Sequence, residues 1–336
     1  MSKSENFDST LRKAIAVLLE HKPDYVQPIS NITNLCKLLG LDFFQDSIQE
    51  EDDNVTSENS ASIQQRLSIA GKILVLDIDY TLNSDTGVSN ISNVMLVLAS
   101  NFDQFNYKNE NGENIFLNNF TKETKLAKFN HNLKILKAMD DFSDVELIDS
   151  DDCFQYYQKT INSIQNFCTE KLNIPKESIF VNKDDEFNLT LCISGKNVLQ
   201  LIPSASEPGA AGSKKLFFDD VEMKWAESEV PANVGCIQFE IRLIADIAFN
   251  ERMSSMFGSE KFQNNKSLTF FELKKSEGPF YLSADFLNIK FKFLWKWIFW
   301  YTNILEGQTT VDEDGETMMK NGQLLKFENE IGTWSF

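Results

Sequence analysis

Aspartates beside apolar runs are the residues of this chain whose type and spacing are best suited to chemistry. Asp77 and Asp79 stand two positions apart within the apolar run Leu74–Leu82, and Asp219 and Asp220 end another such run. Residues two apart in a strand share one face, so Asp77 and Asp79 point the same way. Carboxylates can act as nucleophiles, as acids and bases, and as ligands of magnesium. Any chemistry predicted for this sequence therefore starts from these four side chains.

The string DIDYTL, which begins at Asp77, resembles the D-x-D-x-T opening of the haloacid dehalogenase-like phosphatases. That resemblance implies Asp77 as a nucleophile, Asp79 as acid and base, and a magnesium ion held by Asp219 and Asp220. Ser194 is the best candidate for the phosphate-gripping residue, but it lies only 25 residues before Asp219. The phosphatase fold also requires a crossover helix after its first strand, and a polar turn with a second apolar run stands there instead. We keep a magnesium-dependent phosphatase as the alternative function.

The other side chains that could support catalysis are few. His21 and His131 are the only histidines, and both fall on predicted helices with lysines nearby, where we expect them at the surface. The sequence offers no Ser/His/Asp or Cys/His arrangement and no spaced His/Cys cluster of the kind that binds zinc. An enzyme would therefore have to work with carboxylates alone, and the principal interpretation assigns no residue to catalysis, to a cofactor or to a metal ion.

An antiparallel strand pair is predicted to position Asp77 and Asp79. The first strand buries the residues at its even positions, namely Leu74, Leu76, Ile78, Tyr80 and Leu82. The turn Asn83–Asn93 is too short for a crossover helix, so the return strand Val94–Ala99 is expected to pair antiparallel with the first. In this arrangement both aspartates face solvent or a partner.

The composition indicates a globular protein whose partners are proteins. Of its 336 residues 42% are hydrophobic, which is enough for one large or two modest domains. The formal net charge of -18 would be repelled by nucleic acid phosphates, so we expect no direct contact with nucleic acid and some basic protein partners. The five cysteines lack C-x-x-C spacing and are expected to be reduced thiols of the cytosol or nucleus. The N-terminus has no apolar stretch that could serve as a signal peptide.

The segment Leu287–Leu305 is the only one apolar enough to raise the question of a membrane. Lys290, Lys292 and Lys296 interrupt it, and each would cost about 2.5–3.5 kcal/mol in hydrocarbon. Its core stripe recurs at helical spacing, through Phe291, Leu294, Trp295, Ile298, Tyr301 and Leu305. We therefore predict a buried aromatic helix and no membrane contact.

The predicted fold class is α+β, with a helical N-terminal part, a central antiparallel strand pair packed on helices, and a β-rich C-terminal part with an aromatic helix. The predicted division is a helical segment at 1–45, an acidic linker at 46–62, the strand pair with helices at 63–174, and a β-rich region at 175–336 containing the helix 287–305. Helices are predicted at Phe7–His21, Ile32–Leu39, Ile63–Ile69, Phe116–Ser143 and Asp152–Leu172. Strands are predicted at Ile179–Val181, Phe187–Ile193, Val198–Ile202, Leu216–Met223, Cys236–Ile241 and Leu268–Leu273, with a hairpin in the tail Thr309–Phe336.

Leu35, Leu38 and Leu39 match the L-x-x-L-L box with which coactivators engage nuclear receptors. The same spacing makes the inner face of a short amphipathic helix, which is the interpretation we favour.

Four separated segments resemble, in order, the N-terminal region of the fungal Mediator complex subunit 1 family. They are HKPDYVQPISNITNLCKLLGL, SIAGKILVLDIDY, VMLVLASNFDQFNY and LAKFNHNLKILKAMDDFS. The resemblance covers Leu11–Ser143 and loosens afterwards. In that family the first strand carries acidic residues before a turn and an immediate return strand, which accounts for the phosphatase-like string.

The resemblance implies a non-enzymatic subunit of the middle module of Mediator, a transcriptional coactivator complex of the nucleus. Its function would be that of a protein-binding scaffold that links gene-specific transcriptional regulators to RNA polymerase II. The implied partners are other middle-module subunits and these regulators directly, and the polymerase machinery indirectly. The receptor-binding boxes of animal relatives lie elsewhere, so Leu35, Leu38 and Leu39 inherit no role from them.

Overall fold

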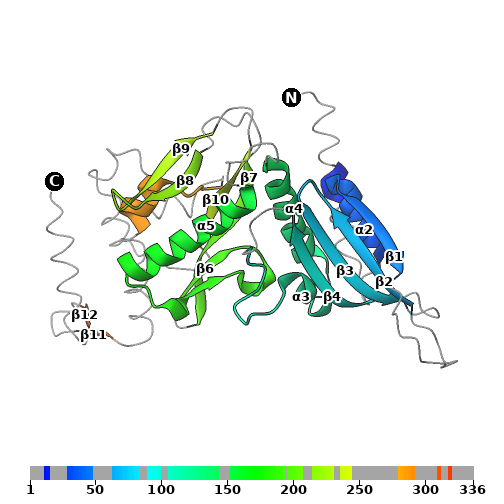
Figure 1. Ribbon diagram of the computed structural model, residues 1–336. Helices are drawn as coiled ribbons and strands as arrows, with labels where there is room; N and C mark the ends of the chain where they lie inside the picture. The colour runs from blue at the N-terminus through cyan, green and yellow to red at the C-terminus, as the bar shows by residue number, and fades with distance from the viewer. Residues whose placement is uncertain are drawn as a thin grey trace.

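A four-stranded antiparallel sheet forms the N-terminal part of the described structure (Figure 1). The computed structural model describes residues 11–15, 29–47, 63–82, 89–99, 105–123, 125–143, 152–193, 195–206, 214–230, 235–243, 279–291, 309–311 and 317–319. The strands lie in the order β1 (Asp42–Ser47), β2 (Ile63–Ala70), β3 (Leu74–Leu82) and β4 (Ser89–Leu98). Together with the helices and the sheets that follow, this sheet confirms the α+β class.

The predicted antiparallel pairing of β3 with its return strand is confirmed. Leu74 pairs with Leu98 and Ile78 with Val94, and the register shifts by one residue after Asp79. The predicted buried face of β3 is also confirmed, because Leu74, Leu76, Ile78 and Tyr80 are buried and Leu82 is half-buried. The return strand begins at Ser89, earlier than the predicted Val94.

The prediction of a helix at Ile63–Ile69 is wrong, because these residues belong to β2. Leu67 and Ile69 point into the core while Arg66 and Ser68 point outward, which is the two-residue period of a strand. β1 was not predicted either, and it places a strand within the N-terminal part expected to be helical. The central unit is therefore a four-stranded sheet and not a strand pair.

Helices cover the inner face of this sheet, and the last of them lies with the C-terminal strands (Figure 1). They are α2 (Ile29–Leu39), α3 (Ile115–Thr121), α4 (Ala127–Phe142) and α5 (Cys153–Asn166), and α5 continues into a π-helical turn at Phe167–Lys171. The pattern predicted as one helix from Phe116 is thus two helices. The predicted apolar stripes are buried, namely Leu126, Phe129, Leu133, Leu136 and Met139 in the first pattern and Phe154, Tyr157, Ile161, Ile164 and Cys168 in the second.

Local signals explain where these helices begin and end. Gly40 adopts φ +68° directly after α2, a conformation that glycine favours and that ends the helix. The Asn114 side chain accepts hydrogen bonds from the N–H groups of Phe116 and Leu117 at the start of α3. At the start of α5 the Asp152 side chain accepts from Gln155.

The C-terminal part is β-rich, as predicted. One antiparallel sheet has the order β10-β7-β6-β5, and two further strand pairs are present. The strands are β5 (Ile179–Val181), β6 (Leu189–Ile193), β7 (Lys196–Ser206), β8 (Lys214–Asp219), β9 (Lys224–Glu229), β10 (Cys236–Leu243), β11 (Thr309–Val311) and β12 (Thr317–Met319). The predicted hairpins between β6 and β7 and in the tail are confirmed.

Several predicted elements lie wholly or partly outside the described residues. Residues 11–15 are helical, but the rest of Phe7–His21 is not described. The strand predicted at Leu268–Leu273 also lies outside. Only the start of the aromatic helix predicted at 287–305 is described. Leu287 lies in the π-helical turn Phe286–Lys290, Phe291 follows that turn, and both side chains are buried. No helix within the described ranges is long and apolar enough to cross a membrane.

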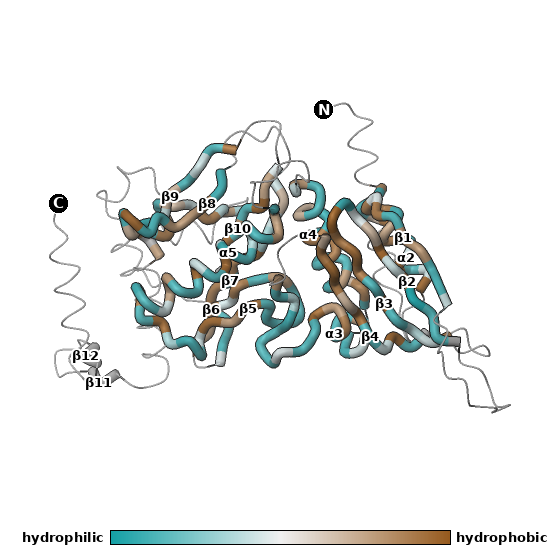
Figure 2. The backbone as a smooth tube through the Cα atoms, in the orientation of Figure 1, coloured by the Kyte–Doolittle hydropathy of each residue, from teal (hydrophilic) through white to brown (hydrophobic). Residues whose placement is uncertain are grey.

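α4 is the element that both parts of the structure share. It contacts α2, α3 and α5, and it also contacts β7 and β10 of the C-terminal sheet. Figure 2 shows segments of hydrophobic residues on both sides of α4. Aromatic side chains fill the space nearby: Phe105 lies 5.3 Å from Phe154 and 5.7 Å from Phe187 between ring centroids. The buried side chains form one hydrophobic cluster that spans the N-terminal and C-terminal sheets.

Candidate functional site

The outer face of the N-terminal sheet carries Asp77 and Asp79, the most prominent candidates of the sequence. Pairing across the strands places Ser68 beside Asp77 and Arg66 beside Asp79 on this face. On the other side of β3, Met95 lies opposite Asp77 and Asn93 opposite Asp79. The helices lie on the opposite, inner face (Figure 1). The outward-pointing side chains of strands β1 to β4 therefore form the candidate site.

Arg66 holds Asp79 in an ion pair on this face. Its Nε donates to Oδ1 of Asp79 at 2.7 Å, and its second nitrogen donates to Oδ2 at 3.3 Å. Asn93 Nδ2 also donates to Asp79 Oδ2 at 3.1 Å. The hydrogen bond from Arg66 is the main reason why the pKa of Asp79 lies below its usual value, with burial acting in the opposite direction. The ionised carboxylate of Asp79 is thereby stabilised.

The expectation that both aspartates face solvent or a partner is wrong for Asp79. Its residue is only 6% exposed, although it points to the outer face, because Arg66 and Asn93 lie against it. Asp77 is half-buried, accepts a hydrogen bond from Ser68 Oγ at 2.6 Å and lies 3.8 Å from Arg66. Both carboxylates are thus engaged by neighbouring strand residues.

The phosphatase arrangement is contradicted by the topology. Asp219 ends β8, which pairs with β9 alone among the described strands, whereas Asp77 lies in the sheet β1-β2-β3-β4. Asp219 accepts hydrogen bonds from the N–H groups of Val221 and Glu222 and so stabilises the β8–β9 turn, which also contains Asp220. β3 is antiparallel to both of its neighbours, whereas the alternative needs parallel strands. Ser194 lies outside the described residues.

Metal-ligating groups do not converge elsewhere in the part of the chain that the structure describes. Within those ranges no three His, Cys, Asp or Glu side chains are placed to hold a metal ion together. His131 was expected at the surface but is half-buried. Burial is the first cause that lowers its pKa, followed by the nearby Arg242 and Lys134.

The L-x-x-L-L residues belong to the core, as favoured from their spacing. Leu35 is 1% exposed, and Leu38 and Leu39 are partly buried against the same hydrophobic cluster. The box is therefore the inner face of α2 and not a free recognition motif.

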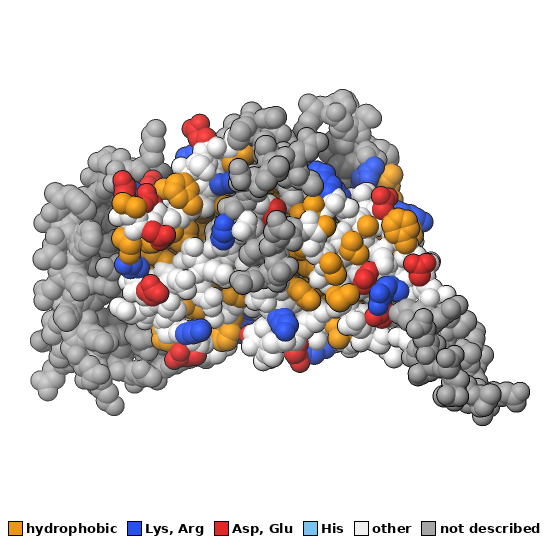
Figure 3. All heavy atoms as spheres, viewed as in Figure 1, with side chains coloured by type: hydrophobic (Ala, Val, Ile, Leu, Met, Phe, Trp, Pro, Cys, Tyr) orange, Lys and Arg blue, Asp and Glu red, His pale blue; other side chains and the backbone are white. Residues whose placement is uncertain are grey.

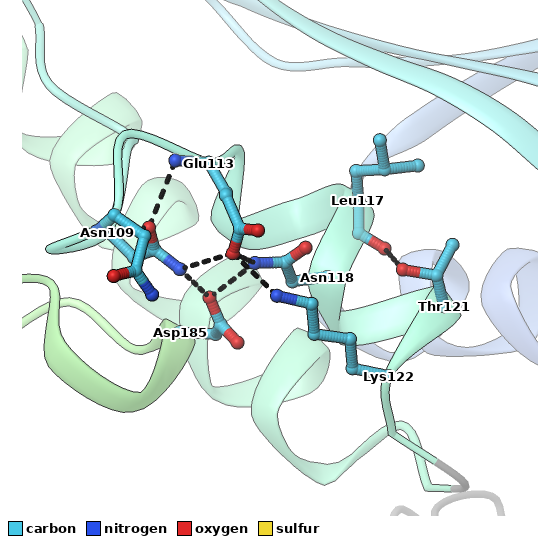
Figure 4. A network of polar contacts seen from close by, with 8 residues as sticks. Asn109, Glu113, Leu117, Asn118, Thr121, Lys122 and Asp185 are labelled. Atoms are coloured by element: carbon cyan, nitrogen blue, oxygen red, sulfur yellow. Dashed lines mark hydrogen bonds and ion pairs between the residues drawn. The ribbon is translucent and has the colours of Figure 1, made fainter.

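A buried network of amide side chains was missed from the sequence. Asp185 accepts hydrogen bonds from Asn109 and Asn118 at 2.8 and 2.9 Å through its carboxylate (Figure 4). Its backbone carbonyl accepts from Asn119 and Asn132 at 3.0 and 2.8 Å. The network joins the loop before α3, both helices α3 and α4, and the segment that leads to β6. The high asparagine content of residues 106–132 was the only available signal.

The outer face of the N-terminal sheet has an apolar end beyond the aspartates. We call the side chains of Phe44, Ala70, Val75, Met95 and Val97 the apolar end of this face. Phe44 is 60% exposed, Met95 40% and Val97 45%. In Figure 3 hydrophobic side chains gather over the N-terminal sheet on the side turned to the viewer, next to basic and acidic side chains. The candidate site thus combines an exposed apolar area with a paired charged area.

These features define an antiparallel α+β protein with an open sheet face, whose prominent aspartates are held in hydrogen bonds. The family model of Mediator of RNA polymerase II transcription subunit 1 matches residues 14–201. The chain belongs to this family, as the four sequence segments indicated.

Individual relatives carry the same name. Mediator of RNA polymerase II transcription subunit 1 of Kluyveromyces lactis is 31% identical over 253 residues, which is 74% of this chain and 55% of that protein. The protein of this name from Saccharomyces cerevisiae is 29% identical over 286 residues, covering 76% of this chain and 47% of its own length. The one from Candida glabrata is 39% identical over 150 residues, or 43% of this chain and 24% of its own. The chain spans about half the length of the first of these relatives.

Proposed function

We propose that this protein is a non-enzymatic subunit of the Mediator coactivator complex, in which it acts as a protein-binding scaffold. The observation that carries the proposal is the family match over residues 14–201, which includes the whole N-terminal sheet and α2 to α5. Relatives from several yeasts are named as subunits of Mediator of RNA polymerase II transcription. The site of action is accordingly the nucleus.

The partners follow from the same proposal. The protein docks on other subunits of the middle module and connects gene-specific regulators to RNA polymerase II, whose machinery it contacts indirectly. The net charge of -18 supports protein partners over nucleic acid, because phosphates repel an acidic surface. The non-enzymatic part is supported by the contacts of Asp77 and Asp79, which tie both carboxylates to Ser68, Arg66 and Asn93.

Copurification tests the proposal. The chain, carrying an affinity tag, replaces the resident subunit 1 in a yeast strain, and the bound proteins are identified by mass spectrometry. We expect the other middle-module subunits in stoichiometric amounts, with a tagged unrelated acidic protein as the control. Recovery of the chain without any Mediator subunit would refute the proposal.

A phosphatase assay tests the non-enzymatic part separately. Purified protein is incubated with magnesium and a generic phosphate ester, in parallel with the Asp77→Asn variant. We expect no turnover above background from either protein. Magnesium-dependent turnover that disappears in Asp77→Asn would contradict the proposal.

A further inference from the structure

The outer face of the N-terminal sheet is more apolar than is usual for a sheet face that is exposed to solvent. Such faces are usually polar, because antiparallel strands alternate apolar residues toward the core with polar residues toward solvent. Here Val75 and Val97 are directly paired on the outer face, with Ala70 beside Val75 and Met95 next along β4. Phe44 lies on the same face of β1 and is 60% exposed. Exposed apolar side chains that gather in this way mark an interaction site more often than isolated ones do.

The charges beside the apolar end are mainly negative. The outer face of the four strands carries the carboxylates of Asp42, Asp46, Asp77 and Asp79, and the guanidinium of Arg66 is the only positive group among its described strand residues. Asp42 and Asp46 are exposed on β1, one on each side of Phe44. An apolar area bordered by carboxylates is complementary to an apolar area bordered by Lys and Arg.

This charge pattern disfavours other occupants. A second copy of the chain, which also carries -18, would bring the same carboxylates against this face. Nucleic acid and an anionic membrane would be repelled for the same reason. A segment of a different, basic protein is the occupant that the charges favour.

The dimensions of the face fit one helix. Four strands at about 4.8 Å spacing and roughly eight residues at about 3.3 Å each give a face of roughly 500 Å². A standard interface takes about 800 Å² from each partner, so the sheet face would supply the centre of an interface and not a whole one. Helices α2, α3 and α4 already cover the inner face, and a helix on the outer face would complete a three-layer arrangement.

We propose that the outer face of the sheet β1–β4 docks a basic amphipathic helix of another Mediator subunit. Phe44, Val75, Met95 and Val97 contact the apolar stripe of that helix, and its Lys and Arg residues lie against Asp42 and Asp46. The inference rests on the proposed function, because it names the surface and the chemistry through which the subunit docks.

Binding to the Mediator middle module assembled without subunit 1 tests the inference. The double variant Met95→Thr/Val97→Thr keeps strand-forming residues and removes exposed apolar area. The matched control is Phe217→Thr on β8, because Phe217 is 46% exposed and Val97 45%. We expect at least a tenfold weaker affinity for the double variant and a change below twofold for the control, with unchanged circular dichroism for all proteins.

A charge variant tests the sign of the partner. Asp42→Lys/Asp46→Lys changes two exposed side chains of an edge strand, and we expect weaker binding with a smaller dependence on salt. Unchanged or tighter binding would show that the partner is not basic.

A photo-crosslinking residue at Val97 identifies what covers the face even if a substituted variant folds poorly. We expect an adduct with a Lys- and Arg-rich helical segment of another subunit. An adduct with an acidic segment, with a second copy of the chain, or none at all in an assembled complex would overturn the inference. If the unsubstituted chain does not bind the module, the proposed function fails and the inference fails with it, whereas normal binding by the double variant refutes the inference alone.

Discussion

Arg66 and Asp79 form a two-point ion pair across β2 and β3, with Nε 2.7 Å from Oδ1 and a second nitrogen 3.3 Å from Oδ2. The pair explains why an aspartate on the outer face of a sheet is nearly inaccessible. It also replaces the catalytic interpretation of Asp79 with a structural one, since the carboxylate is fixed by a guanidinium from the next strand.

Removal of the guanidinium is expected to destabilise the fold. Arg66→Met leaves the buried Asp79 carboxylate with Asn93 as its one side-chain donor among the described residues, which costs about 1–2 kcal/mol after allowance for the exposed side of Arg66. Urea unfolding at pH 7 measures the loss, and Lys196→Met, an exposed lysine at the start of β7, is the control.

The same pair predicts a pH dependence. The pKa of Asp79 is lower in the folded protein than in the unfolded chain. The ion pair therefore stabilises the fold fully at pH values above the unfolded-state pKa of about 3.9. This stabilisation is lost as the pH falls through the lower pKa of the folded state. The stability difference between the wild type and Arg66→Met should therefore shrink below about pH 4. A difference that grows on acidification would contradict the assignment.

Gly71 is required by the close approach of Asp140. The Asp140 carboxylate, at the end of α4, accepts hydrogen bonds from the N–H groups of Lys72 and Ile73 at 2.7 and 2.8 Å. A Cβ at Gly71 would lie 2.3 Å from Oδ2 of Asp140. We expect Gly71→Ala to lower the free energy of unfolding by about 3 kcal/mol, because the clash also breaks these hydrogen bonds.

Gly40→Ala is the control that distinguishes a steric clash at Gly71 from the general loss of stability when a glycine is replaced. Gly40 has φ +68°, but a methyl group added there would have no atom of the described residues within 4 Å, so only backbone strain of roughly 1–2 kcal/mol is expected. Thermal or urea unfolding of both variants gives the comparison. Equal losses would mean that the contact with Asp140 does not constrain Gly71.

The sequence predicted those elements in which apolar period and turn residues agree. β3 and β4 were predicted as an antiparallel pair because the even positions from Leu74 to Tyr80 are apolar and the connection is too short for a helix. α4 and α5 were predicted because their stripes repeat at three and four residues. β1 was missed because five of its six residues are exposed, which leaves no apolar period.

The pattern of Ile63–Ile69 predicts a helix where the structure has β2, and this also affects the site. A helix there places no residue opposite Asp79, so the sequence predicts an exposed aspartate and not its ion pair with Arg66. The asparagine network was beyond the reach of local pattern for another reason: 67 residues separate Asn118 from Asp185. The four-part division of the chain stays a prediction, and α4 contacts helices α2, α3 and α5 on one side of its last boundary and strands β7 and β10 on the other.

Asn132 is expected to be essential to the connection between α4 and the C-terminal sheet. Its side chain is fully buried, donates to the carbonyl of Asp185 at 2.8 Å and accepts from the N–H of Phe187 at 3.0 Å. Asn132→Ala leaves both backbone groups without these partners, which costs about 3 kcal/mol. Urea unfolding measures the loss against Asn111→Ala, an exposed asparagine, which should change stability by less than about 0.5 kcal/mol.

Glu113 is predicted to titrate at an unusually low pH. Hydrogen bonds from Lys122 first, and then from Asn109 and Asn118, lower the pKa of its carboxyl to about 2 (Figure 4). Lys122→Met removes the largest cause and should raise this pKa toward the ordinary value, whereas Lys108→Met, an exposed lysine of the same loop, should not. Carbon-13 NMR of the side-chain carboxyl during a pH titration checks both expectations. A titration of Glu113 near pH 4.5 in the wild type would contradict the network.

The thiols should be unreactive in the folded protein, and Cys192 should be the first to react. All five cysteines are free and buried, and burial raises the pKa of Cys36 and of Cys153 to about 12. Relative to a free thiol of pKa about 8.5, that shift leaves roughly three thousandfold less thiolate, which is the reactive form. Cys192 differs because Lys183 Nζ lies 3.4 Å from its Sγ and opposes the effect of burial on its pKa. Labelling with a chromogenic disulfide at pH 8, followed by peptide mapping, should find Cys192 modified first and a slower first phase in Lys183→Met. Prior labelling of Cys36 or Cys153 in the folded protein would contradict the burial that the structure assigns to them.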